Sequence, residues 1–315
     1  MERSSLARPA GPPRAPDARI APMRASSFLA ASLACLALSA CGPGEDAGSD
    51  ATAGAARRDG GEFVVLSANV RHGAADDGAD RWELRRDDLL AAIASREPDI
   101  LGVQEALDFQ VAFLESGLPH HRRVGQGRDG GGRGEHCALY VDARRFAIVE
   151  HGDFWLSESP AEPASVGWDA ALTRICTWAR VREVGGEREL WIANAHFDHV
   201  GAMARAESAA LVARRAMEAH GPRVVLGDFN AAESSLPLER LRAAGLVDTW
   251  RELHPAVERS GTFHAFQGGL AGDKIDHILR DDGLATREAA ILSEPGPRGR
   301  WPSDHHFVLA KLAWR

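Results

Sequence analysis

Polar side chains follow or precede short apolar runs at six places in this 315-residue sequence. In chain order they are Asn69, Gln104-Glu105, His196 to His199, Asp228 with Asn230, Asp276-His277, and Asp304 to His306. A single polar residue at the end of a strand is usually part of a turn or a helix cap. Six such groups would instead meet at one rim if their strands packed side by side. Carboxylates and imidazoles at one rim can bind a metal ion and exchange protons, so the pattern indicates a candidate catalytic site.

The apolar runs between these groups have the lengths and compositions of strands and helices. Strands are expected at 62–70, 99–105, 137–141, 146–154, 173–184, 190–197, 223–226, 274–279, 286–292 and 307–312. Helices are expected at 82–95, 111–114 and 203–217. Because strands outnumber helices and the two are interspersed, we expect a single mixed α/β domain with helices over sheets. Residues 125–130 match GxGxxG, but no helix is expected after them, which favours a loop over a dinucleotide site.

Several of these polar groups resemble the sequence blocks of a known family. The blocks are Gln104-Glu105, Gly227-Asp228-Phe229-Asn230, the strand that carries Asp276, and Ser303-Asp304-His305. They are similar, in type and order, to those of the endonuclease/exonuclease/phosphatase superfamily, which includes deoxyribonuclease I, and the resemblance extends from about residue 63 to 312. Residues 154–157 and 196–201 are most similar to its deadenylase-like bacterial branch, whose substrates vary. The resemblance implies an α/β fold, a four-layer α/β/β/α sandwich of two stacked mixed sheets flanked by helices, with the site at one edge.

The same resemblance implies a phosphoester substrate and a Mg²⁺ ion, or Mn²⁺ in its place, as cofactor. Glu105 is the expected metal ligand, and Asn69 is expected to supply an uncharged oxygen, either to the ion or one layer further out. Asp304 or Asp276 would orient an imidazole or hold a second metal ion. Arg71 departs from the family pattern, because several nuclease members have an Asp two residues after the Asn. One carboxylate of the metal site is therefore expected to be missing.

The other residues of these blocks are expected to carry the reaction. Asp228 is the expected general base that deprotonates and directs the attacking water. Asn230 lies two residues further on and would donate its amide N–H to the developing negative charge. His196 and His305 would donate N–H groups to the phosphoryl oxygens, and a protonated His305 would add positive charge. Together they predict a metal-dependent phosphoesterase that cleaves a phosphodiester or phosphomonoester by in-line attack of an activated water.

Three other functions remain open from the sequence. A nuclease acting on DNA or RNA fits the same blocks, although the net charge of −8 disfavours sequence-independent binding to a duplex. A non-catalytic surface-displayed binding domain could keep the fold, but the expected chemical positions other than 71 are filled. A zinc hydrolase could use His196, Asp198 and His199, but it would need a histidine where Asn194 stands.

Several further residues have two interpretations. Arg174, on an expected strand, either points at phosphate or forms a surface ion pair. Asp198 and His199 either contact substrate or cap the helix that follows them. Cys137 and Cys176 lie in apolar runs, so they either form a disulfide in an oxidising compartment or remain two buried thiols.

The N-terminal region is typical of an export signal. After Met23-Arg24, an Ala/Leu-rich run ends in Leu38-Ser39-Ala40-Cys41, which resembles a bacterial lipobox with a lipid-modified Cys41. The alternative is a plain signal peptide in which Cys41 is incidental. We therefore divide the chain into an N-terminal extension and lipoprotein signal peptide (1–40), a flexible tether (41–61) and the endonuclease/exonuclease/phosphatase domain (62–315). The mature protein is expected to be a monomer in the periplasm or at the cell surface, in contact with the membrane through a lipid anchor at Cys41.

Overall fold

Two six-stranded β-sheets form the centre of the computed structural model, which describes residues 61–315. The first sheet has the order β11-β12-β1-β2-β4-β3, and its strands are β11 (Leu284–Leu292), β12 (Phe307–Trp314), β1 (Glu62–Asn69), β2 (Ile100–Gln104), β4 (Leu139–Asp142) and β3 (His121–Val124). The second has the order β5-β6-β7-β8-β10-β9, and its strands are β5 (Phe146–Trp155), β6 (Ile175–Glu183), β7 (Glu189–His196), β8 (Arg223–Asp228), β10 (Asp276–Arg280) and β9 (Val247–Asp248). The helices are α1 (Trp82–Ala94), α2 (Asp108–Gly117), α3 (Ala202–Glu218), α4 (Leu236–Ala243) and α5 (Thr249–Leu253), with the 3₁₀ turn η1 (Gly78–Asp80) before α1.

The expected signal peptide, the Cys41 anchor and all but the last residue of the expected tether lie outside the described residues. Within residues 61–315, no helix is both long and apolar enough to cross a membrane.

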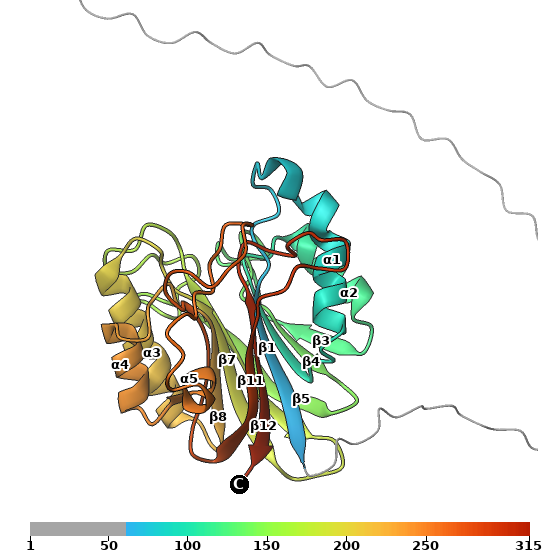
Figure 1. Ribbon diagram of the computed structural model, residues 1–315. Helices are drawn as coiled ribbons and strands as arrows, with labels where there is room; N and C mark the ends of the chain where they lie inside the picture. Colours follow the sequence, from blue (N-terminus) through green and yellow to red (C-terminus); the bar gives the residue numbers. More distant parts are fainter. Residues whose placement is uncertain (1–60) are drawn as a thin grey trace, which may run out of the picture. The chain divides into compact units, whose positions relative to one another are not determined.

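Helices cover the outer face of each sheet (Figure 1). α1 and α2 pack on the first sheet, where Leu89 and Leu114 belong to the same apolar cluster as the β1 side chains Val64 and Leu66. α3 and α4 pack on the second sheet through a separate apolar cluster that includes Val212. The order of helices, sheet, sheet and helices confirms the predicted four-layer sandwich.

An apolar layer between the sheets forms the centre of the core. On β1, Phe63 and Val65 point into this layer, whereas Val64 and Leu66 point to the helices, and all four are at most 3% exposed. Because both faces of the central strands are covered, these strands are continuous apolar runs instead of alternating ones. This is why they stand out in the sequence.

Strand direction brings the polar groups to one edge of each sheet. β1 runs parallel to β2, and β7 runs parallel to β8, so the carboxyl ends of each pair lie together. β12 is antiparallel to β1 and β10 is antiparallel to β8, so the amino ends of β12 and β10 lie at those same edges. The register pairs Asp276 at the start of β10 with Asp228 at the end of β8. Six strand ends are therefore available to build one site.

The structure also contains elements that the sequence analysis did not predict. β3 is a polar edge strand, His121-Arg122-Arg123-Val124, with only its last residue buried, so it has no apolar pattern. α4 is a short helix with a proline in its first turn, and α5 is about one turn long. Residues 125–130 lead into a turn and then β4, without a helix, as expected for a loop.

Cys137 and Cys176 are both buried and unpaired. Burial raises the pKa of the Cys137 thiol to about 12 and the pKa of the Cys176 thiol well above its usual value. Thiols with such pKa values stay protonated and unreactive at neutral pH. The two-thiol interpretation therefore describes the structure, and the disulfide does not.

Candidate active site

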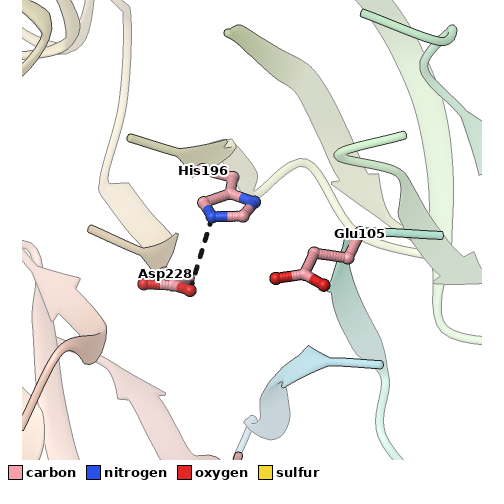
Figure 2. Close-up of side chains that lie close together, drawn as sticks. All are labelled: Glu105, His196 and Asp228. Atoms are coloured by element: carbon pink, nitrogen blue, oxygen red, sulfur yellow. Dashed lines mark ion pairs between the residues drawn. The ribbon is translucent and has the colours of Figure 1, made fainter. Parts of the chain in front are cut away.

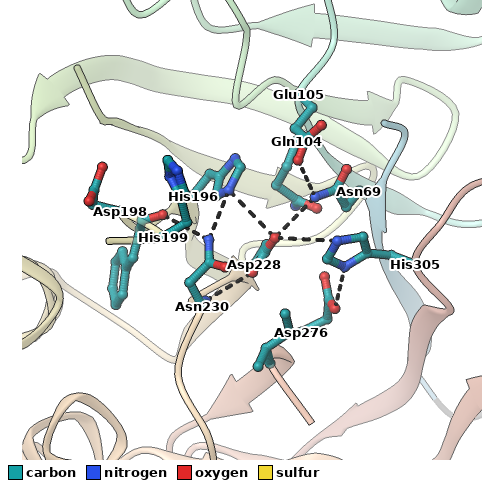
Figure 3. Close-up of polar contacts among 12 residues, drawn as sticks. Asn69, Gln104, Glu105, His196, Asp198, His199, Asp228, Asn230, Asp276 and His305 are labelled. Carbon is teal, nitrogen blue, oxygen red and sulfur yellow. Dashed lines mark hydrogen bonds and ion pairs between the residues drawn. The ribbon is translucent and has the colours of Figure 1, made fainter. Parts of the chain in front are cut away.

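The structure brings all eight predicted site residues together where the six strand ends meet, and Figure 3 labels each of them except Asp304. Asn69 ends β1, Glu105 follows β2, His196 ends β7, Asp228 ends β8 and Asn230 follows it, Asp276 begins β10, and Asp304 and His305 precede β12. The first sheet and the segment before β12 supply four of these residues, and the second sheet supplies the other four. The cluster therefore spans the two sheets.

Asp228 lies at the centre of this cluster and is 1% exposed. Its Oδ2 accepts a hydrogen bond from Asn69 Nδ2 at 3.0 Å and lies 3.5 Å from His196 Nε2 and 3.9 Å from His305 Nε2. Its Oδ1 accepts the backbone N–H of Asn230 at 2.9 Å. These contacts hold the carboxylate in one orientation, so its oxygens can act at a defined position.

Asn69 connects the carboxylates of the two sheets. Besides Asp228, its Nδ2 donates to Glu105 Oε1 at 2.9 Å, and its Oδ1 accepts the backbone N–H of Arg71 at 2.9 Å. The other oxygen of Glu105 accepts the backbone N–H of His72 at 2.8 Å. The amide nitrogen of Asn69 thus faces both carboxylates, and its oxygen is used by the backbone. This arrangement suits a group that positions metal ligands, and direct ligation by Asn69 stays a prediction.

His305 is held in its charged form by carboxylates. Its Nδ1 lies 2.9 Å from Asp276 Oδ2, which leaves Nε2 on the side of Asp228. Burial alone would lower the pKa of His305, but Asp276, Asp228 and Asp304 raise it to about 10. His305 is therefore an imidazolium at neutral pH, with one N–H group directed into the cluster.

His196, in contrast to His305, is held in its neutral form. Burial, together with the positive charges of Arg174 and Arg128, places the pKa of His196 well below its usual value. Its Nε2 lies 3.1 Å from Asn230 Nδ2, and because the amide nitrogen can only donate, Nε2 is the acceptor. Asn230 Nδ2 also donates to the Phe197 carbonyl at 3.0 Å. The expected donation from His196 to a phosphoryl oxygen stays a prediction, and it requires a proton on this nitrogen.

Strained backbone sets the direction of two of these side chains. Glu105 and Asn230 have φ angles of 64° and 46°, in the left-handed region that residues other than glycine rarely occupy. Gly227, with φ of 141°, lies so close to β7 that a Cβ atom would stand 1.9 Å from the Ala195 carbonyl oxygen. Such strain is concentrated at functional sites, where the surrounding structure compensates for its cost.

The carboxylates of the cluster fit a divalent cation. Ligand-type atoms of Glu105, His196 and Asp228 lie within 4.8 Å of one another (Figure 2), as do those of Asp228, Asp276 and His305. Burial and the neighbouring Asp276 raise the pKa of Asp228 to about 7, which marks negative charge that the protein does not neutralise. His305 is already protonated and bonded to Asp276, so the group around Glu105 is the better metal site. A hard cation bound by one or two carboxylates would neutralise this charge.

Arg71 occupies the position where a carboxylate is missing. Its Nη2 lies 2.8 Å from Asp77 Oδ1, and its Nη1 lies 3.6 Å from Asp304 Oδ2. The side chain lines the same cavity as Glu105 and Asp228, with one third of its surface exposed. The departure from the family pattern thus places a cation at the rim of the candidate metal site.

Arg174 and Asp198 form a buried ion pair. Arg174 is 4% exposed, its Nε lies 3.3 Å from Asp198 Oδ2, and its Nη2 donates to His199 Nδ1 at 2.9 Å. The ion pair is therefore not on the surface, and Arg174 also lines the cavity. Asp198 does not cap α3, because Asp169 accepts the N–H groups of its first turn at 2.6 and 3.2 Å. Asp198 instead accepts the N–H groups of the loop before the helix at 2.7 and 3.0 Å.

Asn194 is a positioning residue that the sequence analysis did not select. It is fully buried on β7, and its Nδ2 donates to the carbonyls of Val103 on β2 and of Ala138 just before β4, both at 2.9 Å. Its Oδ1 accepts from Gln104 Nε2 at 2.7 Å, next to Glu105. A buried amide in an otherwise apolar run is the signal that could have revealed it.

A cavity of about 400 Å³ opens in front of the cluster. It is lined by Glu105, His196, Asp228, Asn230, Asp304 and His305 and extends to residues that no predicted block contains, among them His72, Arg128, Glu135 and Phe263. His199 also lines it but belongs to neither group of potential metal ligands found in residues 61–315. The part of the molecule that the structure describes therefore gives no support to a zinc site built on His199.

The sequence and the fold identify the family. The model of the Endonuclease/Exonuclease/phosphatase family matches residues 66–305. The chain belongs to the endonuclease/exonuclease/phosphatase family, whose members are hydrolases that act on phosphoester bonds and typically use a divalent metal ion. No curated protein sequence matches the chain.

Solved structures of bacterial proteins agree with this assignment. A family member from Bacteroides thetaiotaomicron is 32% identical, with a TM-score of 0.75 over 82% of this chain and 100% of that chain. A member from Bacteroides vulgatus is 30% identical, with a TM-score of 0.73 over 81% of this chain and 99% of that chain. A mannosyl-6-phosphatase from Bacteroides thetaiotaomicron is 32% identical, with a TM-score of 0.73 over 80% of this chain and 100% of that chain.

Proposed function

We propose that this protein is an exported metal-dependent phosphoesterase that hydrolyses a phosphomonoester or phosphodiester of a small molecule. The observation that carries the proposal is the position of Asp228. Its buried carboxylate accepts a hydrogen bond from Asn69, which also bonds to Glu105. The same carboxylate lies near His196 and His305, and Glu105, Asp228 and both histidines line one cavity. Mg²⁺ is the proposed ion, with Mn²⁺ as a substitute, because the acidic ligands are oxygen donors.

The side chains of the cluster divide the reaction between them. A cation held at Glu105 would supply charge neutralisation on the phosphoryl oxygens. Asp228, with its pKa raised by burial to about 7, accepts the proton of the attacking water and directs it in line with the leaving group. His305, kept protonated by Asp276, donates from Nε2 to a phosphoryl oxygen. Asn230 would donate an amide N–H to the negative charge that develops on the phosphoryl oxygens once Nδ2 gives up its hydrogen bond to His196 Nε2.

The charges around the cavity favour a small phosphoester. The chain carries a net charge of −8, which opposes binding to a long nucleic acid backbone. Arg71 at the rim adds a cation where the nucleases that the sequence resembles have a carboxylate, and a cation there suits the dianion of a monoester. The likeness to the mannosyl-6-phosphatase supports the same choice.

The test is hydrolysis of p-nitrophenyl phosphate, bis-p-nitrophenyl phosphate and a single-stranded oligonucleotide by the full chain after chelation and metal return. Activity restored by Mg²⁺ or Mn²⁺ is expected, with a loss of at least about 10²-fold in Glu105→Ala and Asp228→Ala. Asp281→Asn is the matched control, since Asp281 is also buried but pairs with Arg223 at the opposite ends of β8 and β10. Parent-like turnover in both alanine variants would sink the proposal, as would activity with Zn²⁺ alone. Exclusive cleavage of the oligonucleotide would favour the nuclease.

We also propose that the protein reaches the periplasm or the cell surface as a monomeric lipoprotein anchored at Cys41. The Ala/Leu-rich run that ends at Cys41 supports this proposal. The full chain expressed in a bacterial host should partition with membranes, and Cys41→Ala should release it into the soluble fraction with an unchanged domain. Equal partitioning of the two proteins would contradict the anchor.

A further inference from the structure

The cavity has two different walls beyond the catalytic cluster. On the side of His196 it is lined by the charged side chains Arg128, Glu135 and Arg174 and by the imidazole of His72. On the side of His305, the ring of Phe263 lies 5.2 Å from the imidazole and is 49% exposed. The cavity volume of about 400 Å³ lies in the range of small-molecule sites.

Arg128 and Glu135 form a close ion pair in the charged wall. Arg128 Nη1 lies 2.6 Å from Glu135 Oε2, and each side chain is 14% exposed. Glu135 Oε1 lies 3.9 Å from His72 Nε2, beyond hydrogen-bond distance. Burial raises the pKa of the Glu135 carboxyl, although Arg128, Arg174 and His72 oppose the shift. Because Arg128 bonds to Oε2 and Oε1 accepts no hydrogen bond from the described residues, the Glu135 carboxylate has an oxygen with acceptor capacity left on a wall of the cavity.

Arg174 adds donors to the same wall. Its Nε and Nη2 are used by Asp198 and His199, but its Nη1 is buried without a hydrogen-bond partner. An unsatisfied buried donor is costly, and a hydroxyl of a bound ligand that reached Nη1 from the cavity would remove this cost. Arg174 is 96% buried and held by its two partners, so its guanidinium keeps a fixed direction.

The charge balance of the wall shows which kind of ligand fits. Arg128 is neutralised by Glu135, and Arg174 by Asp198, so the wall has little net charge for a second phosphate group or a cation. It offers a carboxylate acceptor beside guanidinium donors. A hydroxyl group both donates and accepts, so two neighbouring hydroxyls complement such a wall. Phe263 offers an apolar surface for the carbon face of a ring.

We propose that Arg128, Glu135 and Arg174 form a subsite that binds neighbouring hydroxyls of a sugar, while the phosphate of the same molecule lies at the catalytic cluster. The subsite rests on the proposed phosphoesterase function and assigns its substrate class, a monosaccharide phosphate with free vicinal hydroxyls. The GxGxxG segment and the turn after it thus serve to carry Arg128 and Glu135 to the cavity.

The first test measures specificity as a ratio in the full chain with Mg²⁺. The kcat/KM for hexose 6-phosphates is divided by the kcat/KM for p-nitrophenyl phosphate, which has no hydroxyl groups on its ring. Glu135→Gln should lower this ratio by about 10- to 100-fold, mainly through KM, because a charged hydrogen bond to the sugar is lost. The matched control is Glu115→Gln, which alters an Arg–Glu pair with the same 2.6 Å distance that does not line the cavity. It should leave the ratio unchanged.

The second test needs no variant and so does not depend on how Glu135→Gln folds. Singly deoxygenated hexose 6-phosphates should include two adjacent positions whose loss lowers kcat/KM at least about 10-fold. Equal hydrolysis of all deoxy analogues, an unchanged ratio in Glu135→Gln, or faster turnover of a 2′-deoxynucleoside monophosphate, which has no neighbouring hydroxyls, than of any sugar phosphate would overturn the subsite. In those cases activity on p-nitrophenyl phosphate would still support the phosphoesterase. Failure to hydrolyse any phosphoester with Mg²⁺ or Mn²⁺ would overturn both.

Discussion

Two histidine–carboxylate arrangements share strand β10 but face different surroundings. Asp276 points into the catalytic cluster and pairs with His305 at 2.9 Å. The next residue, His277, is fully buried, and its Nδ1 lies 2.7 Å from Asp248 and 2.8 Å from Lys274, while Nε2 donates to the Ala231 carbonyl. Asp248 also accepts from the Lys274 ammonium group at 2.6 Å.

The two arrangements differ in whether their charge is balanced. Lys274 and His277 hold the pKa of Asp248 far below its usual value, although burial acts in the opposite direction. In the catalytic cluster, burial and a like charge raise the pKa of Asp228 to about 7. The same residue types therefore stabilise the fold in one place and store unneutralised charge in the other. Both arrangements contain a His–Asp pair. The catalytic one differs because it has a carboxylate beside a cavity whose negative charge the protein does not neutralise.

The largest expected effect is on catalysis. Asp228→Asn keeps the shape of the side chain and removes the base, so kcat should fall by about 10²- to 10⁴-fold. Because the replaced carboxylate is buried among like charges, the thermal midpoint of the metal-free protein should stay the same or rise. Steady-state kinetics and calorimetry on the same samples measure both quantities. A large drop in stability would show that the two arrangements do not differ in the way described.

The balanced arrangement should respond in the opposite manner. Asp248→Asn leaves the buried Lys274 ammonium without a counter-charge, which should lower the free energy of unfolding by about 3–5 kcal/mol. For a domain of this size that corresponds to a thermal midpoint lower by roughly 6–20 °C. Activity per folded molecule below the midpoint should change much less than in Asp228→Asn. Urea titration with parallel rate measurements would reveal a contrary result, such as parent-like stability.

The smallest effect is the opposite pH dependence of the two carboxylates. The pKa of Asp228 is higher in the folded chain than its unfolded value of about 3.9, so the folded form retains a proton and its ionisation costs stability between about pH 4 and pH 7. The pKa of Asp248 is lowered, so its stabilisation is present above about pH 4 and is lost as the pH falls.

Thermal midpoints of chelated samples, taken as differences from the parent, measure this contrast. The thermal midpoint of Asp228→Asn should increase relative to that of the parent as the pH rises from 4 to 7. The thermal midpoint of Asp248→Asn should approach that of the parent only below about pH 4. Differences that do not vary with pH would contradict both assignments.

The sequence predicts the fold and the central site because both leave a local trace. Strands covered on both faces are apolar runs, and Glu105, Asp228 and His305 interrupt such runs with polar groups in a family order. The direction of the Asn69 amide and the acceptor role of His196 depend on neighbours from other strands, so local patterns do not reveal them. The same is true of Glu135, which follows a glycine-rich turn, and of Lys274, whose partner Asp248 lies 26 residues away.

The division of the site between two sheets also has a mechanical consequence. Glu105 and Asp228 are attached to different sheets. The interface between the two sheets is largely apolar and has few hydrogen bonds, among them those of the Asn194 side chain. A displacement of about 1 Å of one sheet relative to the other would misalign the reacting groups and lower the rate of hydrolysis about a hundredfold. The rate of hydrolysis therefore depends closely on how the two sheets are aligned. Activity should fall on heating or under pressure before the secondary structure is lost.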